Sequence, residues 1–409
     1  MSKKLYAIFA MLLVAAMVLG ACAQTPAATQ APAATEAPAA TQAPAATQAP
    51  VATEAPAATT APAATTAPAA TTAPAATTAP AATTAPAAKI KVGLVTDTGG
   101  VNDKSFNQSA WEGVQKAAKE FGFDAKFIES KQPTDYEKNI DQFATENYNV
   151  IVTVGFLMGD ATAAKAKQYP KIQFAIIDNA YFPTKDSKAC ADTVKDCYKD
   201  GGLTNVTSLM FQEDQVGFLA GVLAGGMTKT NTVCSVAGME IPPVVRYVVG
   251  YQTGAKWINS KAKALNVYIP SFVDPAKGKE TGQSMIGQGC DVVFGVGGNT
   301  GNGGLLAASE KGLMAIGVDV DQYNTYPEVK GSLISSAMKN VDVAVYEYLK
   351  VAQAGTPQSG IVTANLQNGG VGLAPFHDWE SKIPDTVKAK IKEATDGLKS
   401  GSIQTGYKP

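Results

Sequence analysis

The chain has 409 residues, 45% of them hydrophobic and 17% charged, which is enough for more than one hydrophobic core. Its 34 Lys and Arg residues nearly balance its 35 Asp and Glu residues, so there is no electrostatic reason to expect nucleic-acid binding. The single arginine, Arg246, argues against polyanion recognition, and the single histidine, His377, without a Cys-x-x-Cys pair, argues against a metal site.

Residues 1–22 have the order of a secretory signal peptide. Lys3 and Lys4 precede an apolar run over 5–18 that is too short to span a bilayer, and Leu-Gly-Ala then leads to Cys22. This ending resembles the bacterial lipobox, which implies that Cys22 is acylated and anchors an extracytoplasmic protein to the cell membrane. The alternative is an ordinary cleaved signal with an incidental cysteine.

Residues 23–88 repeat a six-residue unit such as Ala-Pro-Ala-Ala-Thr-Thr. A proline in each unit disfavours helix, and the small side chains bury too little apolar surface to offset the entropy of ordering. We therefore expect a disordered linker. At roughly 3 Å per residue its contour length approaches about 200 Å, which suits a tethered domain.

Short β-branched runs alternate with helical patterns in the remaining chain, as in a βαβ succession. The first series predicts strands over 90–96, 125–128, 150–155 and 174–178, with helices over 113–121 and 139–146. The second predicts strands over 232–238, 265–272, 292–297 and 315–320, with a helix after Pro242 and Pro243. We expect an α/β fold of two doubly wound parallel-sheet lobes.

Three strand-like segments, 208–213, 331–338 and 360–366, are expected to cross between the lobes and form a hinge. This arrangement assigns 89–208 plus about 334–363 to the N-terminal lobe and 209–333 plus about 364–409 to the C-terminal lobe. Ligands of open α/β sheets bind beyond the carboxyl ends of the strands, so the cleft between the lobes is the expected site.

Four cysteines remain after Cys22, and an exported compartment permits disulfides. Cys190 and Cys197 lie seven residues apart in a polar segment, where a local bridge would staple a loop. Cys234 and Cys290 each begin an apolar strand-like run, and the sequence leaves open whether they are buried thiols or a second bridge.

Five segments in this order carry a family resemblance: GGVNDKSFNQ, FLAGVLAG, DPAKGKE, GVGGNTGNGG and IGVDVDQ. Together they resemble the basic-membrane-protein family of solute-binding lipoproteins, and within it the purine-nucleoside receptors. The resemblance implies a type I periplasmic-binding-protein fold, like that of ribose receptors. It also implies a monomeric receptor that is not an enzyme and has no cofactor. Such a receptor delivers a nucleoside to the permease of an ABC importer.

The same resemblance implies which side chains contact the ligand. The acids and aromatic residues that follow strands take first place, together with one glycine backbone and one lysine: Asp97, Phe106, Asp178, Phe272, Gly298, Asp319 and Lys339. Candidates of second rank are Thr98, Phe156, Arg246, Tyr247 and Asp321.

Elementary chemistry supports this set. A nucleoside has a flat base and two vicinal hydroxyls, so it calls for aromatic stacking and for carboxylates that accept hydrogen bonds. Stacking of a base on an aromatic ring contributes about 1–3 kcal/mol, and a hydrogen bond to a charged group about 1.5–3 kcal/mol. Phe106 and Phe272 are the candidates for the stacking.

Each residue also has a simpler structural explanation. Phe106 and Phe272 fit a helix core and a strand, and Asp97 and Asp178 fit helix caps or lysine partners. Lys339 fits a solvated surface. Asp319 competes with Asp321, which alternation places on the same side of an extended chain, and Arg246 fits a pair with an acid such as Glu240.

Three alternative functions remain open. A sugar or signalling-molecule receptor uses the same lobes, and a secreted nucleoside hydrolase would use paired acids such as Asp97 and Asp319. The glycine cluster over 295–304 suggests a dinucleotide site, but Thr300 occupies the place of the third glycine in G-x-G-x-x-G. Close approach of the backbone to a bound solute explains these glycines as well.

Overall fold

The computed structural model describes residues 89–355, 357 and 359–408. The predicted leader, the lipid anchor at Cys22 and the repeat linker over 23–88 lie outside these residues. Within the described part of the chain, no helix is long and apolar enough to cross a membrane.

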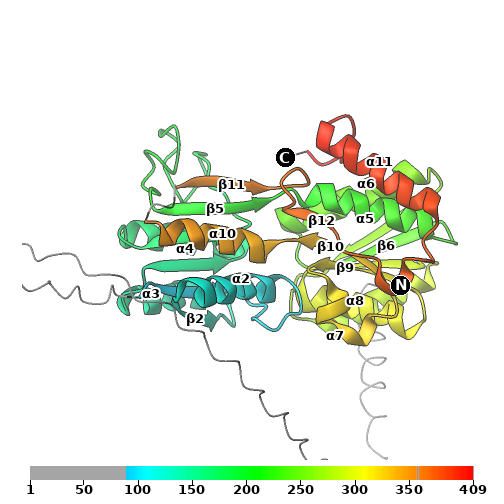
Figure 1. Cartoon of the computed structure of the whole chain (residues 1–409), viewed down its shortest axis with the longest axis horizontal. Coiled ribbons are helices and arrows are strands. Elements are labelled where there is room, and N and C mark those ends of the chain that lie inside the picture. Colours follow the sequence, from blue (N-terminus) through cyan, green and yellow to red (C-terminus); the bar gives the residue numbers. More distant parts are fainter. Residues whose placement is uncertain (1–88, 356, 358, 409) are drawn as a thin grey trace, which may run out of the picture. The chain divides into compact units, whose positions relative to one another are not determined.

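The first lobe is built on a six-stranded parallel sheet with the order β11-β5-β4-β3-β1-β2 (Figure 1). Its strands are β1 (Lys91–Thr96), β2 (Asp124–Glu129), β3 (Val150–Val154), β4 (Gln173–Ile177), β5 (Val206–Phe211) and β11 (Gly360–Ala364). Its helices are α2 (Phe106–Phe121), α3 (Tyr136–Thr145), α4 (Gly159–Gln168) and α10 (Val341–Gln353), with the short turns η1 (Pro133–Asp135) and η2 (Phe156–Met158).

The second lobe repeats this order in a sheet β12-β10-β9-β8-β6-β7, in which only β12 is antiparallel to its neighbour. Its strands are β6 (Thr232–Ala237), β7 (Lys263–Tyr268), β8 (Val292–Val296), β9 (Met314–Asp319), β10 (Leu333–Lys339) and β12 (Val371–Leu373). Its helices are α5 (Glu213–Met227), α6 (Pro242–Ile258), α7 (Pro275–Gly287), α8 (Gly298–Glu310), α9 (Gln322–Thr325) and α11 (Asp385–Ser400), with the turns η3 (Pro327–Val329) and η4 (His377–Trp379).

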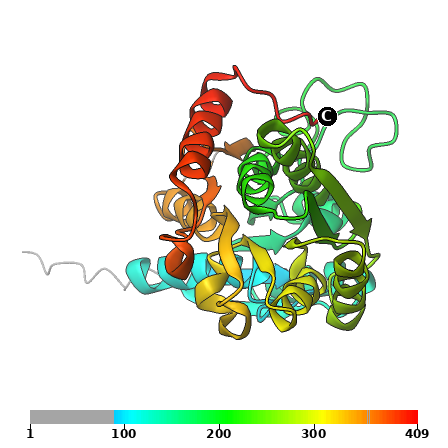
Figure 2. The same ribbon diagram turned by 90° about the vertical axis from the view of Figure 1, so that its right-hand side faces the viewer.

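Both faces of the sheets are covered, as the uninterrupted apolar strands predict. In β3, Val152 belongs to the cluster under α2 and α10, whereas Ile151 belongs to the cluster under α3 and α4. The second lobe has one additional layer, because α11 packs outside the sheet against α5, which can be followed in the two views of Figures 1 and 2.

The chain crosses between the lobes three times: at Gln212 after β5, at Asn340 after β10, and over 365–370 between β11 and β12. The expected lobe boundary near residue 334 was wrong, because the chain returns to the first lobe only at Asn340. The strand β10 pairs with β9 and β12, so it belongs to the second lobe, and the return to the first lobe begins with α10. A strand pattern alone does not show which sheet a strand joins.

Two further boundaries differ from the sequence-based expectations. The first helix begins at Phe106 rather than near Gly113, because Asp103 caps its first turn by accepting hydrogen bonds from backbone N–H groups. The strand β7 ends at Tyr268 rather than at Phe272, since Pro270 has no N–H to continue the ladder.

Glycines allow α5 and α6 to pack with their backbones in close contact. A Cβ added at Gly221 would press on the carbonyl oxygen of Tyr251, and one added at Gly254 would press on that of Phe218. The same relation holds along the whole contact, at Gly217, Gly225 and Gly250. The FLAGVLAG segment is therefore a packing motif of the second lobe.

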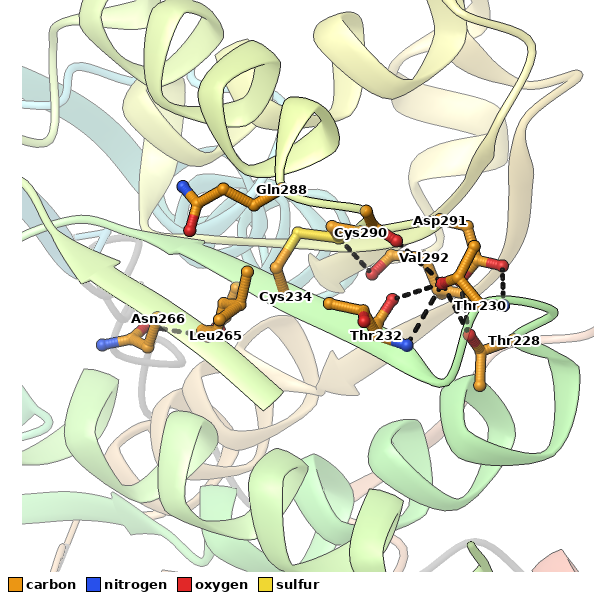
Figure 3. Close-up of a disulfide and its surroundings, with 12 residues drawn as sticks. Thr228, Thr230, Thr232, Cys234, Leu265, Asn266, Gln288, Cys290, Asp291 and Val292 are labelled. Carbon is orange, nitrogen blue, oxygen red and sulfur yellow. Dashed lines mark hydrogen bonds between the residues drawn. A yellow bond between two sulfur atoms is a disulfide. The ribbon is translucent and has the colours of Figure 1, made fainter. Parts of the chain in front are cut away.

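Two disulfides connect the four remaining cysteines of the described chain. Cys190 pairs with Cys197 in the long loop between β4 and β5, which has no helix or strand (Figure 2). Cys234 in β6 pairs with Cys290, which precedes β8 (Figure 3). Beside this second bridge, the carboxylate of Asp291 accepts hydrogen bonds from the turn that precedes β6, so two turns of the second lobe are held together.

Replacing Gly221 by alanine is expected to lower the free energy of unfolding by about 1–3 kcal/mol, because the added methyl group overpacks the contact between α5 and α6. The matched control is Gly287→Ala at the end of α7, where an added Cβ meets nothing within 4 Å. The control should keep its stability, since alanine is the better helix former. Chemical denaturation measures both; equal loss in the two variants would contradict the packing argument.

Candidate functional site

A cavity lies between the two lobes, at the carboxyl ends of their strands. The space between the lining residues, counted together with the open mouth, is about 550 Å³. The first lobe lines it with Asp97, Gly99, Asp103, Phe106, Asn107, Gly155, Phe156 and Asp178. The second lobe adds Ile241, Pro243, Val244, Tyr247, Phe272, Val296, Gly297, Gly298, Val318, Asp319 and Lys339.

The structure brings all seven residues of first rank together in this cavity: Asp97, Phe106, Asp178, Phe272, Gly298, Asp319 and Lys339. Of the second-rank candidates, Phe156 and Tyr247 also line it. Thr98, Arg246 and Asp321 do not.

Two of the acids occupy equivalent positions in the two lobes. Asp178 directly follows β4, and Asp319 ends β9, the corresponding strand of the second sheet. Both have left-handed backbone, with φ of 70° and 65°. Such backbone is uncommon outside glycine, and it turns the chain sharply where each carboxylate reaches the cavity.

Among the residues that the structure describes, Lys339 is the only lysine or arginine that lines the cavity, and it is 1% exposed. Its Nζ lies 2.6 Å from Oδ2 of Asp178 and 2.9 Å from Oε1 of Glu213. The ring centroids of Phe106 and Phe211 lie 4.8 Å and 4.9 Å from the same nitrogen. The ammonium is thus held by two carboxylates and two aromatic faces.

The acidity of these groups follows from burial and neighbouring charge. Burial raises the pKa of Asp178 to about 7, although the ammonium of Lys339 opposes the rise. Burial alone would raise the pKa of Glu213, but Lys339 and Arg246 together hold that pKa below its usual value. Burial also raises the pKa of the Asp319 carboxyl. With a pKa of about 7, Asp178 changes its protonation state near neutral pH.

A second polar cluster lies on the first lobe. The side-chain amide of Asn107 donates to Oδ1 of Asp97 at 3.0 Å and to Oδ2 of Asp103 at 3.1 Å. Burial raises the pKa of Asp97 and takes that of Asp103 to about 6. In the described chain, no group of three or more acidic, histidine or cysteine side chains is placed to hold a metal ion. These acids are hydrogen-bond acceptors.

Two buried acceptor atoms of the cavity residues lack a hydrogen-bond partner in the described structure: Oδ1 of Asp178 and Oδ1 of Asn107. A buried polar atom without a partner costs about 1–3 kcal/mol, so a hydrogen bond donated to either atom would be stabilising.

The aromatic walls come from opposite lobes. Phe106 begins α2, and Phe272 lies in the loop after β7. The glycines after β8 make room for the second ring: a Cβ at Gly297, where φ is 107°, would lie 3.1 Å from the Phe272 ring. The glycine cluster is thus explained here by close packing, and Gly303 allows α8 to approach Pro275 of α7.

The loop that precedes Phe106 also contacts the second lobe. Asn302 donates to the carbonyl oxygen of Asp103 at 3.0 Å. Gln322 and Thr325 donate to that of Lys104 at 3.2 Å and 2.8 Å. We call residues 102–105 the cross-lobe loop. Its contacts hold the two lobes together beside the cavity, which Asp103 lines.

Ser105 completes these contacts by donating to Oδ2 of Asp319 at 2.5 Å. Ser105 is the N-cap residue of α2, but its side chain makes no capping bond, because Asp103 accepts from the N–H groups of the first turn. The hydroxyl is therefore available to the opposite lobe.

Two of the three candidates that do not line the cavity have structural partners. Arg246 pairs with Glu213, its Nε 2.6 Å from Oε2, rather than with Glu240. Asp321 caps α9 and lies 2.7 Å from Nε2 of His377.

Sequence reasoning missed Asp103, Asn107 and Glu213. Asp103 and Asn107 lie close in sequence to the predicted site residue Phe106, and this proximity could have identified them. Glu213 had no such signal, because its role depends on Lys339, which is distant in sequence.

Comparison with protein families matches residues 90–403 to the family described as Bmp, ABC transporter substrate-binding protein PnrA-like. Among similar curated proteins, the ABC transporter nucleoside-binding protein BmpA of Lactococcus lactis subsp. cremoris is 36% identical over 327 residues, which is 75% of this chain and 88% of BmpA. A CD4+ T-cell-stimulating antigen of Listeria monocytogenes is 34% identical over 78% of this chain and 88% of its own. A lipoprotein of Pyrococcus abyssi is 32% identical over 75% of this chain and 77% of its own.

Solved structures show the same fold. A solute-binding protein of an ABC transporter system from Aeropyrum pernix aligns with a TM-score of 0.67 at 28% identity, over 77% of this chain and 92% of that one. A periplasmic ribose ABC transporter protein from Conexibacter woesei aligns with a TM-score of 0.50 at 14% identity, over 72% and 95%. The predicted type I periplasmic-binding-protein fold is confirmed, and this chain belongs to the Bmp family of PnrA-like ABC transporter substrate-binding proteins.

Proposed function

We propose that this chain captures a purine nucleoside between its lobes and delivers it to the permease of an ABC importer. The observation that carries the proposal is the composition of the cavity. Phe106 and Phe272 face it from opposite lobes, and the buried acceptor atoms of Asp178 and Asn107 have no partner in the described structure. The printed name of the Lactococcus relative, a nucleoside-binding protein, supports the same ligand class.

A nucleoside carries groups that match both the aromatic and the polar residues of the cavity. The base lies between the two aromatic rings, where stacking contributes about 1–3 kcal/mol per ring. The ribose hydroxyls donate to the buried carboxylates, and the ammonium of Lys339 donates to an acceptor of the ligand. A purine covers more of each ring than a pyrimidine does. Binding one molecule to both lobes shifts the population toward the form in which the lobes meet.

The charge of the cavity separates nucleosides from nucleotides. Four aspartates line it, Asp97, Asp103, Asp178 and Asp319, against the single ammonium of Lys339. A phosphate group would bring further negative charge into a buried acidic site. The neutral nucleoside is therefore the favoured form of the ligand.

We also propose that the protein is anchored outside the cell membrane. The lipobox-like segment before Cys22 and the printed lipoprotein name of the Pyrococcus relative support a lipid anchor on the outer side of the cell membrane. The repeat over 23–88 would let the two lobes move while they stay close to the permease.

The main test is titration calorimetry of residues 89–409 with guanosine, inosine, adenosine, cytidine, guanosine monophosphate and ribose. Purine nucleosides are expected to bind with a Kd below about 1 μM, because stacking and charged hydrogen bonds add together. The monophosphate and ribose should bind at least about 100-fold more weakly, since one adds charge and the other lacks the base. Intact nucleoside should be recovered after incubation. Equal affinity for ribose, or release of free base, would overturn the proposal.

Phe106→Ala is expected to weaken purine-nucleoside binding by at least fivefold, which corresponds to the loss of one stack of about 1 kcal/mol or more. The matched control is Phe182→Ala, because Phe182 is 59% exposed and does not line the cavity. Calorimetry and thermal unfolding are measured on both variants. A large drop in Tm with unchanged affinity would show that Phe106 is a core residue.

The raised pKa of Asp178 predicts opposite effects of pH on stability and on affinity. The folded carboxyl, with a pKa of about 7, holds its proton more tightly than the unfolded one, near 4, so its contribution to stability falls as pH rises between these values. A ligand hydroxyl favours the ionised carboxylate. The Kd should therefore fall as pH rises through about 6 to 7, with proton release on binding.

Calorimetry in two buffers of different ionisation enthalpy measures the released protons at pH 6.5. Asp178→Asn is the control and should release fewer protons, leaving the contribution of Asp103, whose pKa is about 6. An affinity independent of pH between 5.5 and 8 would show that Asp178 does not accept from the ligand.

A further inference from the structure

The ammonium of Lys339 has three N–H donors, and the structure shows partners for two of them. Asp178 accepts at 2.6 Å and Glu213 at 2.9 Å, and the residue itself lines the cavity. The ammonium is tetrahedral, so two fixed donors also fix the direction of the third. The side chains that hold Lys339 therefore decide which point of the cavity receives a donor.

Glu213 holds the ammonium of Lys339 from outside the cavity. Its side chain is fully buried and does not line the site. One carboxylate oxygen accepts from Lys339, and the other accepts from Nε of Arg246 at 2.6 Å. Arg246 also lies outside the cavity, so the chain's one arginine is used to keep Glu213 ionised rather than to contact a ligand.

The pair also joins two of the three crossings between the lobes. Glu213 begins α5 directly after the crossing at Gln212, and Lys339 ends β10 directly before the crossing at Asn340. Both residues thus lie at the hinge edge of the second lobe, whereas Asp178 belongs to the first lobe, so a movement of the lobes about the crossings moves the ammonium relative to Asp178.

We propose that Glu213, supported by Arg246, is a positioning residue of the ligand site: it directs the free N–H of Lys339 into the cavity and makes that direction depend on the hinge. This inference rests on the proposed function for its effect on affinity. Its effect on Lys339 itself is independent of any ligand.

The test uses Glu213→Gln, which keeps the size of the side chain and removes its charge. The first readout is the titration of the Lys339 ammonium by NMR in the ligand-free protein, with Lys339→Met to assign the signal. The charges facing this ammonium are Asp178, Glu213 and Asp319, with Arg246 behind Glu213. Loss of one carboxylate should lower the titration midpoint by at least one pH unit. The second readout is the Kd for guanosine, which should rise at least tenfold.

Two further variants separate charge from position and from helix structure. Glu213→Asp keeps the charge but withdraws it from Lys339, so the Kd should rise while the midpoint changes less than in Glu213→Gln. It also carries the test if Glu213→Gln does not fold. Asp214→Asn is the matched control: Asp214 lies on the same helical turn but accepts from Thr405 instead, and both readouts should stay unchanged.

An unchanged midpoint or an unchanged Kd in Glu213→Gln, or an equal change of both readouts in Asp214→Asn, would overturn the positioning role. If the unaltered protein binds no nucleoside, the proposed function fails. The titration of Lys339 in the ligand-free protein still decides whether Glu213 holds the ammonium.

Discussion

The buried ion pairs of Lys339 are the constraint on which the arrangement of the two lobes depends. One ammonium, almost without solvent exposure, is shared by Asp178 of the first lobe and Glu213 at the hinge. Removing charges from water is costly and is offset only where each has close partners. Here Asp178 follows β4, Glu213 begins α5 and Lys339 ends β10, so the charges are satisfied only when the two sheets and the crossing segments are correctly placed together.

The doubled architecture explains how the site is formed. Each sheet has the same strand order, and each delivers an acid with left-handed backbone from the corresponding strand. Two similar lobes that face one another thus place equivalent polar strand ends at one cavity. Differences between the lobes make the cavity asymmetric. The first lobe adds the polar cluster of Asn107, and the second adds Lys339 and most of the apolar wall.

Much of this could be predicted from the sequence, for a physical reason. Buried parallel strands appear as continuous apolar runs, and the residues that follow them lie at one edge of a sheet, so Asp97, Asp178 and Asp319 were found from their positions along the chain together with the family resemblance. The contacts of Glu213 and of Arg246 could not be found in this way. Side chains distant in sequence meet through the path of the crossings, and the pattern of β10 does not state which sheet it joins.

The cross-lobe loop has a consequence for the rates of binding. Residues 102–105 hold the second lobe through Asn302, Gln322 and Thr325, and they lead directly into Phe106 and Asn107 of the cavity wall. A molecule enclosed by this wall leaves only after those hydrogen bonds break. Its residence time is therefore governed by the opening of the protein, and the same contacts limit entry, so affinity and exchange rate need not change together.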